Sequence, residues 1–347
     1  MEISKELFGK VGGKEVYLVT ISHSSGACIK IMNYGATWVS ALIPDINGTL
    51  ADVLLGYSTL EGYLSDTNCM GSTVGRFANR INHARFILHD QTYLLDKNDG
   101  DNNIHGGFTG FHHQVFDYEQ TGDAVVFTYH SPDGEGGFPG NVTVKITYSF
   151  SDDLKVRIHY RATTDKDTYL NLTNHAYFNL SGDENILNHQ LQISSDKILD
   201  TNDWFIPTGE YKPVEGTPFD FKVMKAVGEN IHEQNLQLIR NRGYNHCYPL
   251  EFQVLKKQQL PAATLSDPTS HRQLKLFTTL PSVLIYTAGF LKSVLPGKSG
   301  KKHHPFEGIC LEAQFYPDSP NHPYFPTCLI QKNEVYHHEI EFHFSLI

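Results

Sequence analysis

Alternation of apolar and polar residues with a period of two dominates the chain. Residues 141–150 alternate valine, isoleucine and aromatic side chains with threonine, lysine and serine. Residues 156–161 repeat this pattern after the turn sequence Ser151-Asp152-Asp153, which predicts a β-hairpin. A short, mainly apolar run at 283–287 predicts a strand buried on both faces. Further strands are expected at 15–21, 27–32, 124–129, 169–172, 190–193, 273–278 and 339–344.

Helical patterns are scarce by comparison. Short helical turns are expected only near residues 59–64 and 227–230. An all-β fold, with a sandwich or a barrel as its architecture, is therefore expected. The proline- and glycine-rich stretches at 132–140 and 317–326 have no change of composition beside them, so they are interpreted as structured loops. We accordingly expect residues 1–347 to form a single domain.

Composition narrows the classes of function. The 347 residues are 40% hydrophobic and 19% charged, which is typical of a soluble globular protein. The 38 acidic residues outnumber the 28 basic ones, and this net charge of −10 argues against a nucleic-acid partner. No apolar run approaches the roughly 18–20 residues of a membrane span, and residues 1–10 lack the apolar core of a signal peptide. The five cysteines include no C-x-x-C pair, so we expect a cytoplasmic protein without a disulfide framework.

Histidine is unusually frequent, with 19 residues. Three adjacent pairs, His112-His113, His303-His304 and His337-His338, raise the alternative of a metal enzyme on a β-barrel. Neighbours on a strand point to opposite faces of the sheet, so such pairs are poor chelators of one ion. We therefore expect neither a metal site nor another cofactor.

Three segments that contain glycine also carry polar side chains that could form a site. The sequence 75–81, Gly-Arg-Phe-Ala-Asn-Arg-Ile, offers two guanidinium groups for carboxylates or sugar oxygens, or for structural ion pairs. In 102–107, Asn-Asn-Ile-His-Gly-Gly, the two glycines would let the backbone approach a neighbour closely. The third segment, 131–140, is dense in turn residues and could be a long hairpin loop.

Two further segments contain candidate acids and bases. In 173–180, Thr-Asn-His-Ala-Tyr-Phe-Asn-Leu, His175 is either a general acid or base or a structural histidine. In 310–321, Glu312 stands between Leu311 and Ala313. An apolar setting raises the pKa of a carboxyl group toward the range of a useful base, although outward-facing glutamates are also common on strands.

Together these segments resemble the aldose 1-epimerase family, the galactose mutarotases. The match runs in order along nearly the whole chain, and includes Pro-Phe-Asp-Phe at 218–221. The pair of segments 173–180 and 310–321 is its most specific part. The resemblance implies a large single-domain β-sandwich that interconverts the α- and β-anomers of hexopyranoses such as galactose and glucose. It also implies general acid and base catalysis, without a metal, a nucleotide or a covalent intermediate.

The resemblance implies a role for particular residues. Glu312 would be the base that removes the proton of the C1 hydroxyl, and His175 the acid that protonates the ring oxygen. His105 would form a hydrogen bond near that oxygen and help to orient and polarise it. The expected sugar-binding residues are Arg80, Asn79, Asn245 and Tyr177, with Phe178 beside Tyr177 as a second wall of the site.

Three positions depart from the family pattern. Asn245 stands where the family usually has Asp, and it keeps an acceptor oxygen without the charge. Since hydrogen bonds to charged groups contribute roughly 1.5–3 kcal/mol and neutral ones about 0.5–1.5 kcal/mol, some sugar affinity should be lost. The missing anion should also lower the pKa of Glu312. Gly289 replaces a usual Asn, which removes a polar group, and Asn333 replaces a usual Gly but tolerates positive φ.

Two alternatives on the same scaffold stay open. A hexose-6-phosphate 1-epimerase would need a cationic cluster for the phosphate, for which Arg76 and Arg80 are candidates. A non-catalytic sugar-binding protein is suggested by Asn245 and Gly289. The expected partner in each case is a small-molecule sugar, bound by a monomer or a homodimer.

Overall fold

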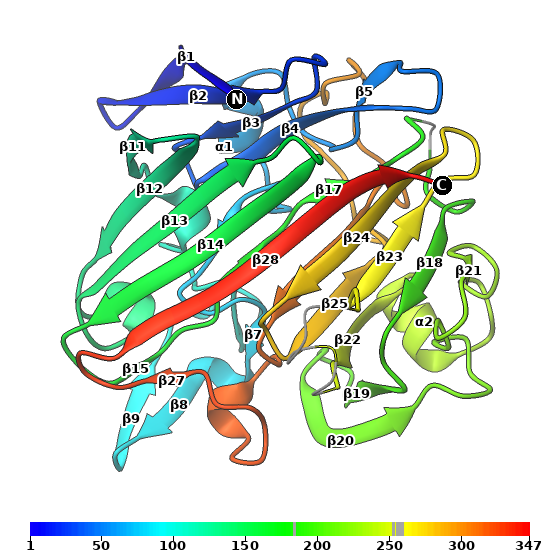
Figure 1. Cartoon of the computed structure of the whole chain (residues 1–347). Helices are drawn as coiled ribbons and strands as arrows, with labels where there is room; N and C mark the ends of the chain where they lie inside the picture. The colour runs from blue at the N-terminus through cyan, green and yellow to red at the C-terminus, as the bar shows by residue number, and fades with distance from the viewer. Residues whose placement is uncertain (183–184, 252–253, 255–259) are drawn as a thin grey trace.

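A computed structural model describes residues 1–182, 185–251, 254 and 260–347, and most of its regular structure is antiparallel strands (Figure 1). The all-β prediction is thereby confirmed. The largest sheet has nine strands. In spatial order they are β11 (Asp117–Thr121), β12 (Ala124–Ser131), β13 (Val142–Phe150), β14 (Lys155–Thr164), β28 (Val335–Leu346), β24 (Arg272–Thr278), β23 (Ala263–Ser266), β18 (Gln190–Ile193) and β21 (Lys225–Ala226).

Two smaller sheets complete a β-sandwich. A four-stranded sheet lies behind the large one in the view of Figure 1, in the order β17 (Tyr177–Phe178), β26 (Ile309–Gln314), β25 (Ser282–Tyr286) and β22 (Asn245–Pro249). A five-stranded sheet at the top contains β1 (Glu2–Val11), β2 (Lys14–Ser22), β3 (Cys28–Met32), β4 (Thr37–Pro44) and β5 (Leu50–Asp52). Phe342 of β28 joins all three, because its ring centroid lies 5.3 Å from that of Trp38 and 5.2 Å from that of Phe178.

Short ribbons and helices connect these sheets. The two-stranded ribbons are β6 (Thr73–Val74) with β16 (Thr173–Asn174), β7 (Arg80–Ile81) with β10 (Asn103–Ile104), β8 (Arg85–Leu88) with β9 (Gln91–Leu94), β15 (Thr168–Tyr169) with β27 (Leu329–Ile330), and β19 (Lys197–Thr201) with β20 (Pro207–Pro213). The α-helices in the described part of the chain are α1 (Leu60–Leu64) and α2 (Leu236–Asn241).

The strands with strict alternation were predicted well. β13 and β14 form the expected hairpin, with Val142 opposite Thr164 and Phe150 opposite Val156. Every second side chain of β13 is buried, since one face packs on the core while the other faces solvent. β25 is buried at four of its five positions, as its mainly apolar sequence indicated.

Two local predictions were wrong, and one helix was missed. Residues 227–230 form turns rather than a helix. The helix α2 was not expected, because Leu236 and Ile239 are exposed and the segment shows no apolar face. Its start is set instead by Asn235, whose side chain accepts a hydrogen bond from the backbone of Gln237. Of the expected strand 169–172, only Tyr169 belongs to a strand.

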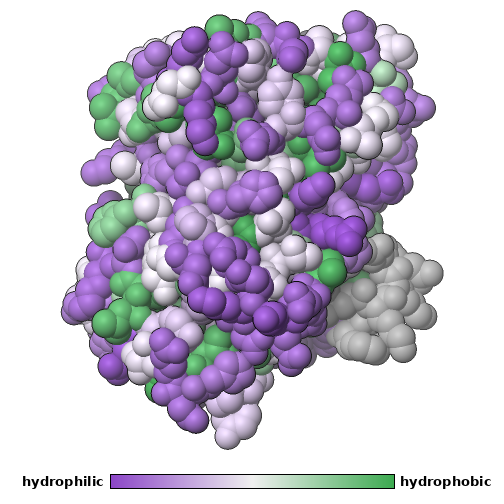
Figure 2. Space-filling view, turned by 90° about the vertical axis from the view of Figure 1, so that its left-hand side faces the viewer, coloured by the Kyte–Doolittle hydropathy of each residue, from purple (hydrophilic) through white to green (hydrophobic). Residues whose placement is uncertain are grey.

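One large cluster of buried apolar side chains takes members from Val19 to Phe344. The face in Figure 2 is mainly hydrophilic, with apolar residues scattered among polar ones. The assignment of residues 1–347 to one domain stays a prediction. Within the described residues, no helix has both the length and the apolar character needed to cross a membrane.

Candidate active site

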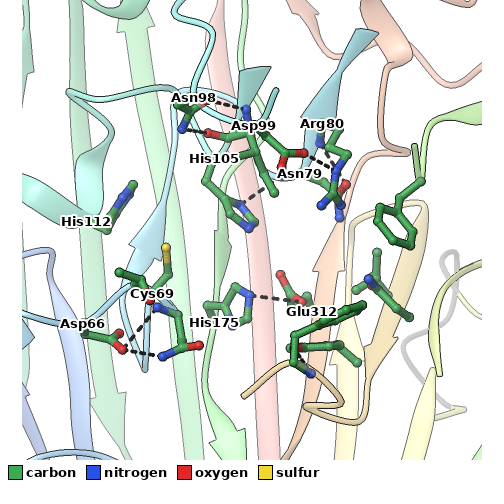
Figure 3. Close-up of a pocket in the computed structure, with 18 of the residues that line it drawn as sticks. Asp66, Cys69, Asn79, Arg80, Asn98, Asp99, His105, His112, His175 and Glu312 are labelled. Atoms are coloured by element: carbon green, nitrogen blue, oxygen red, sulfur yellow. Dashed lines mark hydrogen bonds and ion pairs between the residues drawn. The ribbon is translucent and has the colours of Figure 1, made fainter. Parts of the chain in front are cut away.

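A pocket of about 690 Å³ lies above the four-stranded sheet, and the site residues expected from the sequence converge on it (Figure 3). All seven of them line this pocket: Asn79, Arg80, His105, His175, Tyr177, Asn245 and Glu312. Segments more than two hundred residues apart in the sequence therefore contribute to one cavity.

The register of the four-stranded sheet arranges the floor of the pocket. Glu312 on β26 lies directly opposite Leu284 on β25. On the other side of β26, Tyr177 lies opposite Cys310. Because side chains two residues apart share a face of a strand, His175 stands next to Glu312. Glu312 is thus flanked by His175 on one side and by Leu284 on the other.

A second row of the floor runs parallel to this one. Cys310 lies opposite Tyr286, and Tyr286 lies opposite Asn245 on the outermost strand β22. Asn245 is therefore separated from β26 by one strand, which corresponds to roughly 10 Å between strands two apart. One side of the floor therefore carries the ionisable groups of His175 and Glu312. The other side carries the neutral side chains of Leu284 and Asn245.

Glu312 and His175 form a buried pair at the centre of the floor. Nε2 of His175 lies 3.6 Å from Oε1 of Glu312. Only 1% of the Glu312 surface is exposed. Burial raises the pKa of Glu312 to about 8 and lowers the pKa of His175 to about 4. Near neutral pH the pair therefore holds one proton between its two members.

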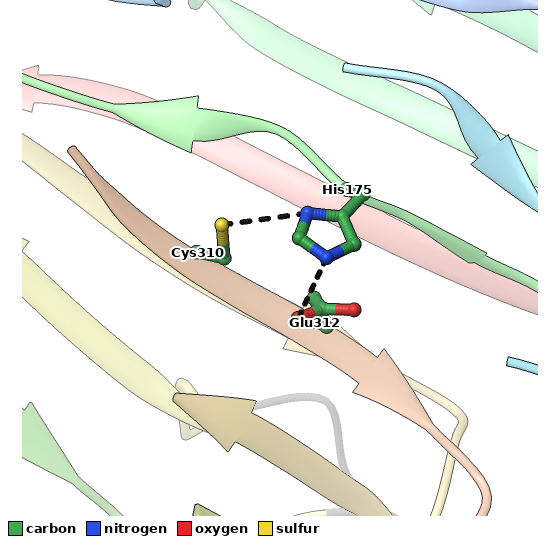
Figure 4. A group of neighbouring side chains, drawn as sticks. All are labelled: His175, Cys310 and Glu312. Atoms are coloured by element: carbon green, nitrogen blue, oxygen red, sulfur yellow. Dashed lines mark hydrogen bonds and ion pairs between the residues drawn. The ribbon is translucent and has the colours of Figure 1, made fainter. Parts of the chain in front are cut away.

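Cys310 completes the surroundings of the His175 ring (Figure 4). Its Sγ lies 3.5 Å from Nδ1 of His175, and the thiol is fully buried. Burial raises the pKa of the thiol well above its usual range, so the sulfur is present as a neutral S–H group. Each ring nitrogen of His175 thus has its own neighbour, Cys310 at Nδ1 and Glu312 at Nε2.

His105 faces the same space from the opposite wall, with its ring centroid 5.4 Å from that of His175. The backbone N–H of Asn79 donates a hydrogen bond to Nδ1 of His105, at 3.2 Å. Burial lowers the pKa of His105 well below its usual range, so its ring is neutral. A neutral ring that accepts at Nδ1 carries its proton on Nε2, which makes His105 a hydrogen-bond donor.

The glycines around His105 allow two chain segments to touch. Gly106 has φ +84°, and a Cβ there would lie 2.0 Å from the carbonyl oxygen of Gly75. Only glycine fits this contact, which holds segment 102–107 against segment 75–81. The close approach that the sequence predicted for this glycine pair is therefore confirmed.

Arg80 is held in place from three directions. Its Nε donates to Oδ2 of Asp99 at 2.7 Å, and its guanidinium carbon lies 4.9 Å from the ring centroid of Phe205. The backbone N–H of Asp318 donates to the Arg80 carbonyl at 2.8 Å. The proline-rich segment 317–326 thus fixes the backbone at the edge of the pocket.

Arg76 has a structural role and does not line the pocket. It is 2% exposed. Its guanidinium donates to the hydroxyl of Ser131 at 2.7 Å and to the carbonyl oxygens of Pro132 at 2.7 Å and Pro139 at 2.9 Å. Segment 131–140 is therefore a loop wrapped around this buried cation rather than part of the site.

Nearly the whole chain, residues 17–343, matches the family model described as aldose 1-epimerase. The chain belongs to the aldose 1-epimerase family. A curated relative from Mus musculus, named galactose mutarotase, is 37% identical and covers 100% of this chain and 99% of its own length. An aldose 1-epimerase of Haemophilus influenzae is 36% identical over 92% of this chain and 93% of its own.

Solved structures of aldose epimerase relatives share the fold. An aldose epimerase homologue from C. elegans superposes with a TM-score of 0.88 at 28% identity, covering 95% of this chain and 99% of that one. A galactose 1-epimerase from Lactobacillus acidophilus gives a TM-score of 0.87 at 26% identity, with 99% of both chains covered. The expected β-sandwich of the galactose mutarotase type is thus confirmed.

Two positions where this family member differs from the expected pattern have local explanations. A Cβ at Gly289 would lie 2.0 Å from the carbonyl oxygen of Arg242, so the backbone leaves no room for a side chain there. Asn333 has φ +66°, which asparagine tolerates as expected from the sequence. Phe178, in contrast, does not form the expected second wall, because its side chain is fully buried in the core and does not line this pocket.

The ligand atoms of His175, Cys310 and Glu312 lie within 4.8 Å of one another, which is close enough to consider a metal ion. However, the sulfur faces Nδ1 and the carboxylate faces Nε2 of the same ring (Figure 4). A single ion binds only one of these nitrogens, so the arrangement suits a chain of hydrogen-bonding groups better than a metal centre.

Several lining residues of this epimerase-type pocket were not expected from the sequence. They come from loops, from the 3-10 helix Phe111–His113 or from the strand β25, and they include Asp66, Cys69, Asp99, His112, Phe205, Leu284 and Phe290. Aromatic and acidic residues in loops are too common to indicate a site by themselves. Leu284 could have been found only from its position opposite Glu312 in the sheet. That position depends on the pairing of two strands, which a single sequence does not show.

Proposed function

We propose that the protein interconverts the α- and β-anomers of hexopyranoses such as galactose and glucose. The observation that carries this proposal is the buried pair of Glu312 and His175, 3.6 Å apart on the floor of a pocket large enough for a sugar. The names of the relatives, galactose mutarotase and aldose 1-epimerase, support the same reaction.

The reaction needs one base and one acid. Glu312 removes the proton of the C1 hydroxyl while His175 protonates the ring oxygen O5, and the ring opens to the aldehyde. Rotation about the C1–C2 bond turns the other face of C1 toward O5. Closure then returns a proton to the C1 oxygen and removes the proton from O5. Each of the two groups typically contributes roughly 10²–10⁴-fold to the rate.

The shared proton of the pair suits a reaction that runs equally in both directions. Burial favours the proton on Glu312, whereas attraction between opposite charges 3.6 Å apart favours it on His175. Ring opening starts from the second arrangement. Because closure retraces the same steps, Glu312 and His175 must each act in both protonation states. A small difference in free energy between the two positions of the proton therefore favours the reaction in both directions.

The remaining lining residues bind and orient the sugar in this proposal. His105 donates from Nε2 near the ring oxygen. Arg80 and Asn79 bind hydroxyl groups, and Asn245 does so from the far strand of the floor. Tyr177, whose ring stacks on that of His175 with centroids 5.1 Å apart, forms a wall.

The pH profile of kcat/KM should be flat near neutrality and fall on both sides. Below a pH of about 4 the pair takes up a second proton and loses its base. Above a pH of about 8 it loses its last proton and has no acid. Initial rates of optical rotation, corrected for the spontaneous reaction at each pH, would measure the profile. A rate that rises steadily from pH 5 to 10 would contradict the shared-proton pair.

Asn245→Asp should strengthen binding of galactose or glucose. A carboxylate accepts stronger hydrogen bonds from hydroxyl groups than an amide does, by about 1 kcal/mol, which is roughly a fivefold lower KM. KM values from polarimetry on both sugars check this. An unchanged or higher KM would mean that the pocket does not place a sugar hydroxyl at this position.

The pocket gives less support to a hexose-6-phosphate substrate. Among the described residues that line it, Arg80 is the single Lys or Arg, and it is already paired with Asp99. Asp66 and Glu312 add further acidic groups. Arg76, the other cation considered for a phosphate, is enclosed by loop carbonyls. A non-catalytic sugar-binding protein would not need the buried pair.

We further propose that the enzyme works in the cytoplasm as a monomer or a homodimer, with a free sugar as its partner. The net charge of −10 supports the proposal that it does not bind nucleic acid. Size-exclusion chromatography coupled to light scattering would give the oligomeric state.

Polarimetry is the direct test of the proposed function. Freshly dissolved α-D-galactose is followed with and without the protein, and the measurement is repeated with α-D-glucose. We expect a fast approach to the anomeric equilibrium. Binding of the sugars without any acceleration would favour a non-catalytic sugar-binding protein instead.

A further inference from the structure

The side of the floor away from His175 differs in character from the catalytic side. Leu284 lies directly opposite Glu312, and its side chain is almost fully buried. An isobutyl group offers neither a donor nor an acceptor. A hydroxyl group held against it would give up bonds to water without replacing them, which disfavours binding.

The geometry of a pyranose decides which part of the sugar meets Leu284. The following step rests on the proposed function, with the C1 hydroxyl at Glu312 and O5 at His175. In the ring, C1 stands between O5 and C2. Since His175 and Leu284 flank Glu312 on opposite sides, the substituent on C2 points toward Leu284. Asn245 lies on this same side of Glu312, in the neighbouring row of the floor opposite Tyr286.

Asn245 is a neutral amide on the same side of Glu312 as Leu284. It lines the pocket, and its backbone N–H donates to Nδ1 of His246 at 3.0 Å. Within the described residues, no hydrogen bond of the Asn245 side chain is found, so its oxygen and its NH₂ group are both available to a ligand. An amide offers one acceptor and two donors side by side.

Two aromatic side chains also line the pocket, Phe205 and Phe290, and their ring centroids lie 6.2 Å apart. The backbone N–H of Phe290 donates to the hydroxyl of Tyr286 at 3.1 Å, and Tyr286 lies opposite Asn245. A substituent that suits this region therefore needs a short polar part for Asn245 and a small apolar part for Leu284 and the two phenylalanines.

We propose that the enzyme accepts 2-acetamido-2-deoxyhexopyranoses, that is N-acetylhexosamines, and prefers them to the parent hexoses. The N–H of the acetamido group donates to Oδ1 of Asn245, and its carbonyl oxygen accepts from Nδ2. The acetyl methyl group packs on Leu284 and Phe290. The chemistry at C1 and O5 is unchanged, so no additional reactant is required.

The first test compares substrates on the wild-type protein. Polarimetry on N-acetyl-D-glucosamine, N-acetyl-D-galactosamine, D-glucose and D-galactose gives kcat/KM for each. We expect at least a tenfold preference for each acetamido sugar over its parent, the size of effect that a well-fitted substituent gives. A ratio of one or less, with active parent sugars, overturns this inference and leaves the proposed function intact. Failure to accelerate any of the four sugars contradicts the proposed function itself.

A second measurement separates recognition of the amide from simple rejection of a hydroxyl group. With 2-deoxy-D-glucose, which has only hydrogen at C2, we expect at least about tenfold lower kcat/KM than with N-acetyl-D-glucosamine. Equal values would mean that the amide is not bound, and would overturn the proposal.

Asn245→Asp tests the assigned contact. A carboxylate still accepts the acetamido N–H but repels the carbonyl oxygen, so the acetamido-to-parent ratio should fall at least tenfold. The ratio is measured within one preparation, so partial loss of folded protein cancels. Asn98→Asp is the matched control, because it makes the same change on the wall beside Asp99 (Figure 3). The assigned contact is overturned if the acetamido-to-parent ratio falls equally in both variants, or if it falls in neither of them.

Discussion

Glu312→Gln should lower kcat/KM for anomer exchange by roughly 10²–10⁴-fold, the usual contribution of a general base. Glutamine has nearly the same shape, but its amide cannot take the proton of the C1 hydroxyl. The replacement also removes the group that ionises near pH 8, so the alkaline fall of the pH profile should disappear from any residual activity. Polarimetry with galactose and with N-acetyl-D-galactosamine would measure both effects.

The fold should survive this substitution. Oε2 of Glu312 is buried and has no hydrogen-bond partner among the described residues, so a neutral amide does not break an existing bond. Thermal unfolding checks this point. Glu339→Gln, on the outward face of β28, is the matched control and should keep full activity. Near-normal exchange in Glu312→Gln would show that another group is the base.

His175→Asn should be of similar severity, with a loss of roughly 10²–10⁴-fold. The variant keeps a polar group of smaller size at the floor but lacks the nitrogen that protonates O5. The acidic fall of the pH profile should vanish with it, because that fall reflects protonation of the His175 ring. Rates measured from pH 4 to 10 would resolve this loss from a general decrease.

The double variant Glu312→Gln with His175→Asn gives the sharper comparison. Two groups that act on one proton are expected to be strongly non-additive, so the double variant should be about as slow as the slower single one. If the loss of kcat/KM in the double variant equals the product of the two single losses, Glu312 and His175 have independent roles. His113→Asn, at another histidine that lines the same pocket, is the control for the substitution itself.

Sequence patterns located the strands that have one face in solvent. β13, β14 and β28 alternate because each second side chain enters the core, and that alternation is visible in the chain. β26 is buried at all six positions, so its residues carry no such signal. The helix α2 is short and exposes apolar side chains, and no local pattern distinguishes it from a loop.

The candidate site was located through the family resemblance more than through local chemistry. Nothing near Glu312 in the sequence shows that His175 becomes its neighbour, since that contact depends on the pairing of β17 with β26. Leu284 and Phe290 were missed for the same reason. Conversely, the sequence left Arg76 as a candidate for binding a ligand. The structure shows that its guanidinium instead donates to backbone carbonyl oxygens of segment 131–140. The individual roles of the seven predicted site residues stay predictions.

The position of β28 has a consequence for how the protein is made. β28 follows every strand that it joins, yet it lies between β14 and β24 in the middle of the nine-stranded sheet (Figure 1). Until β28 has been synthesised, the sheet consists of two separate halves that end at β14 and at β24. Each half has an unpaired edge that can bind strands of other chains. Substitutions that weaken β28 should reduce the yield of soluble protein from cells, while the molecules that do fold turn over sugar normally.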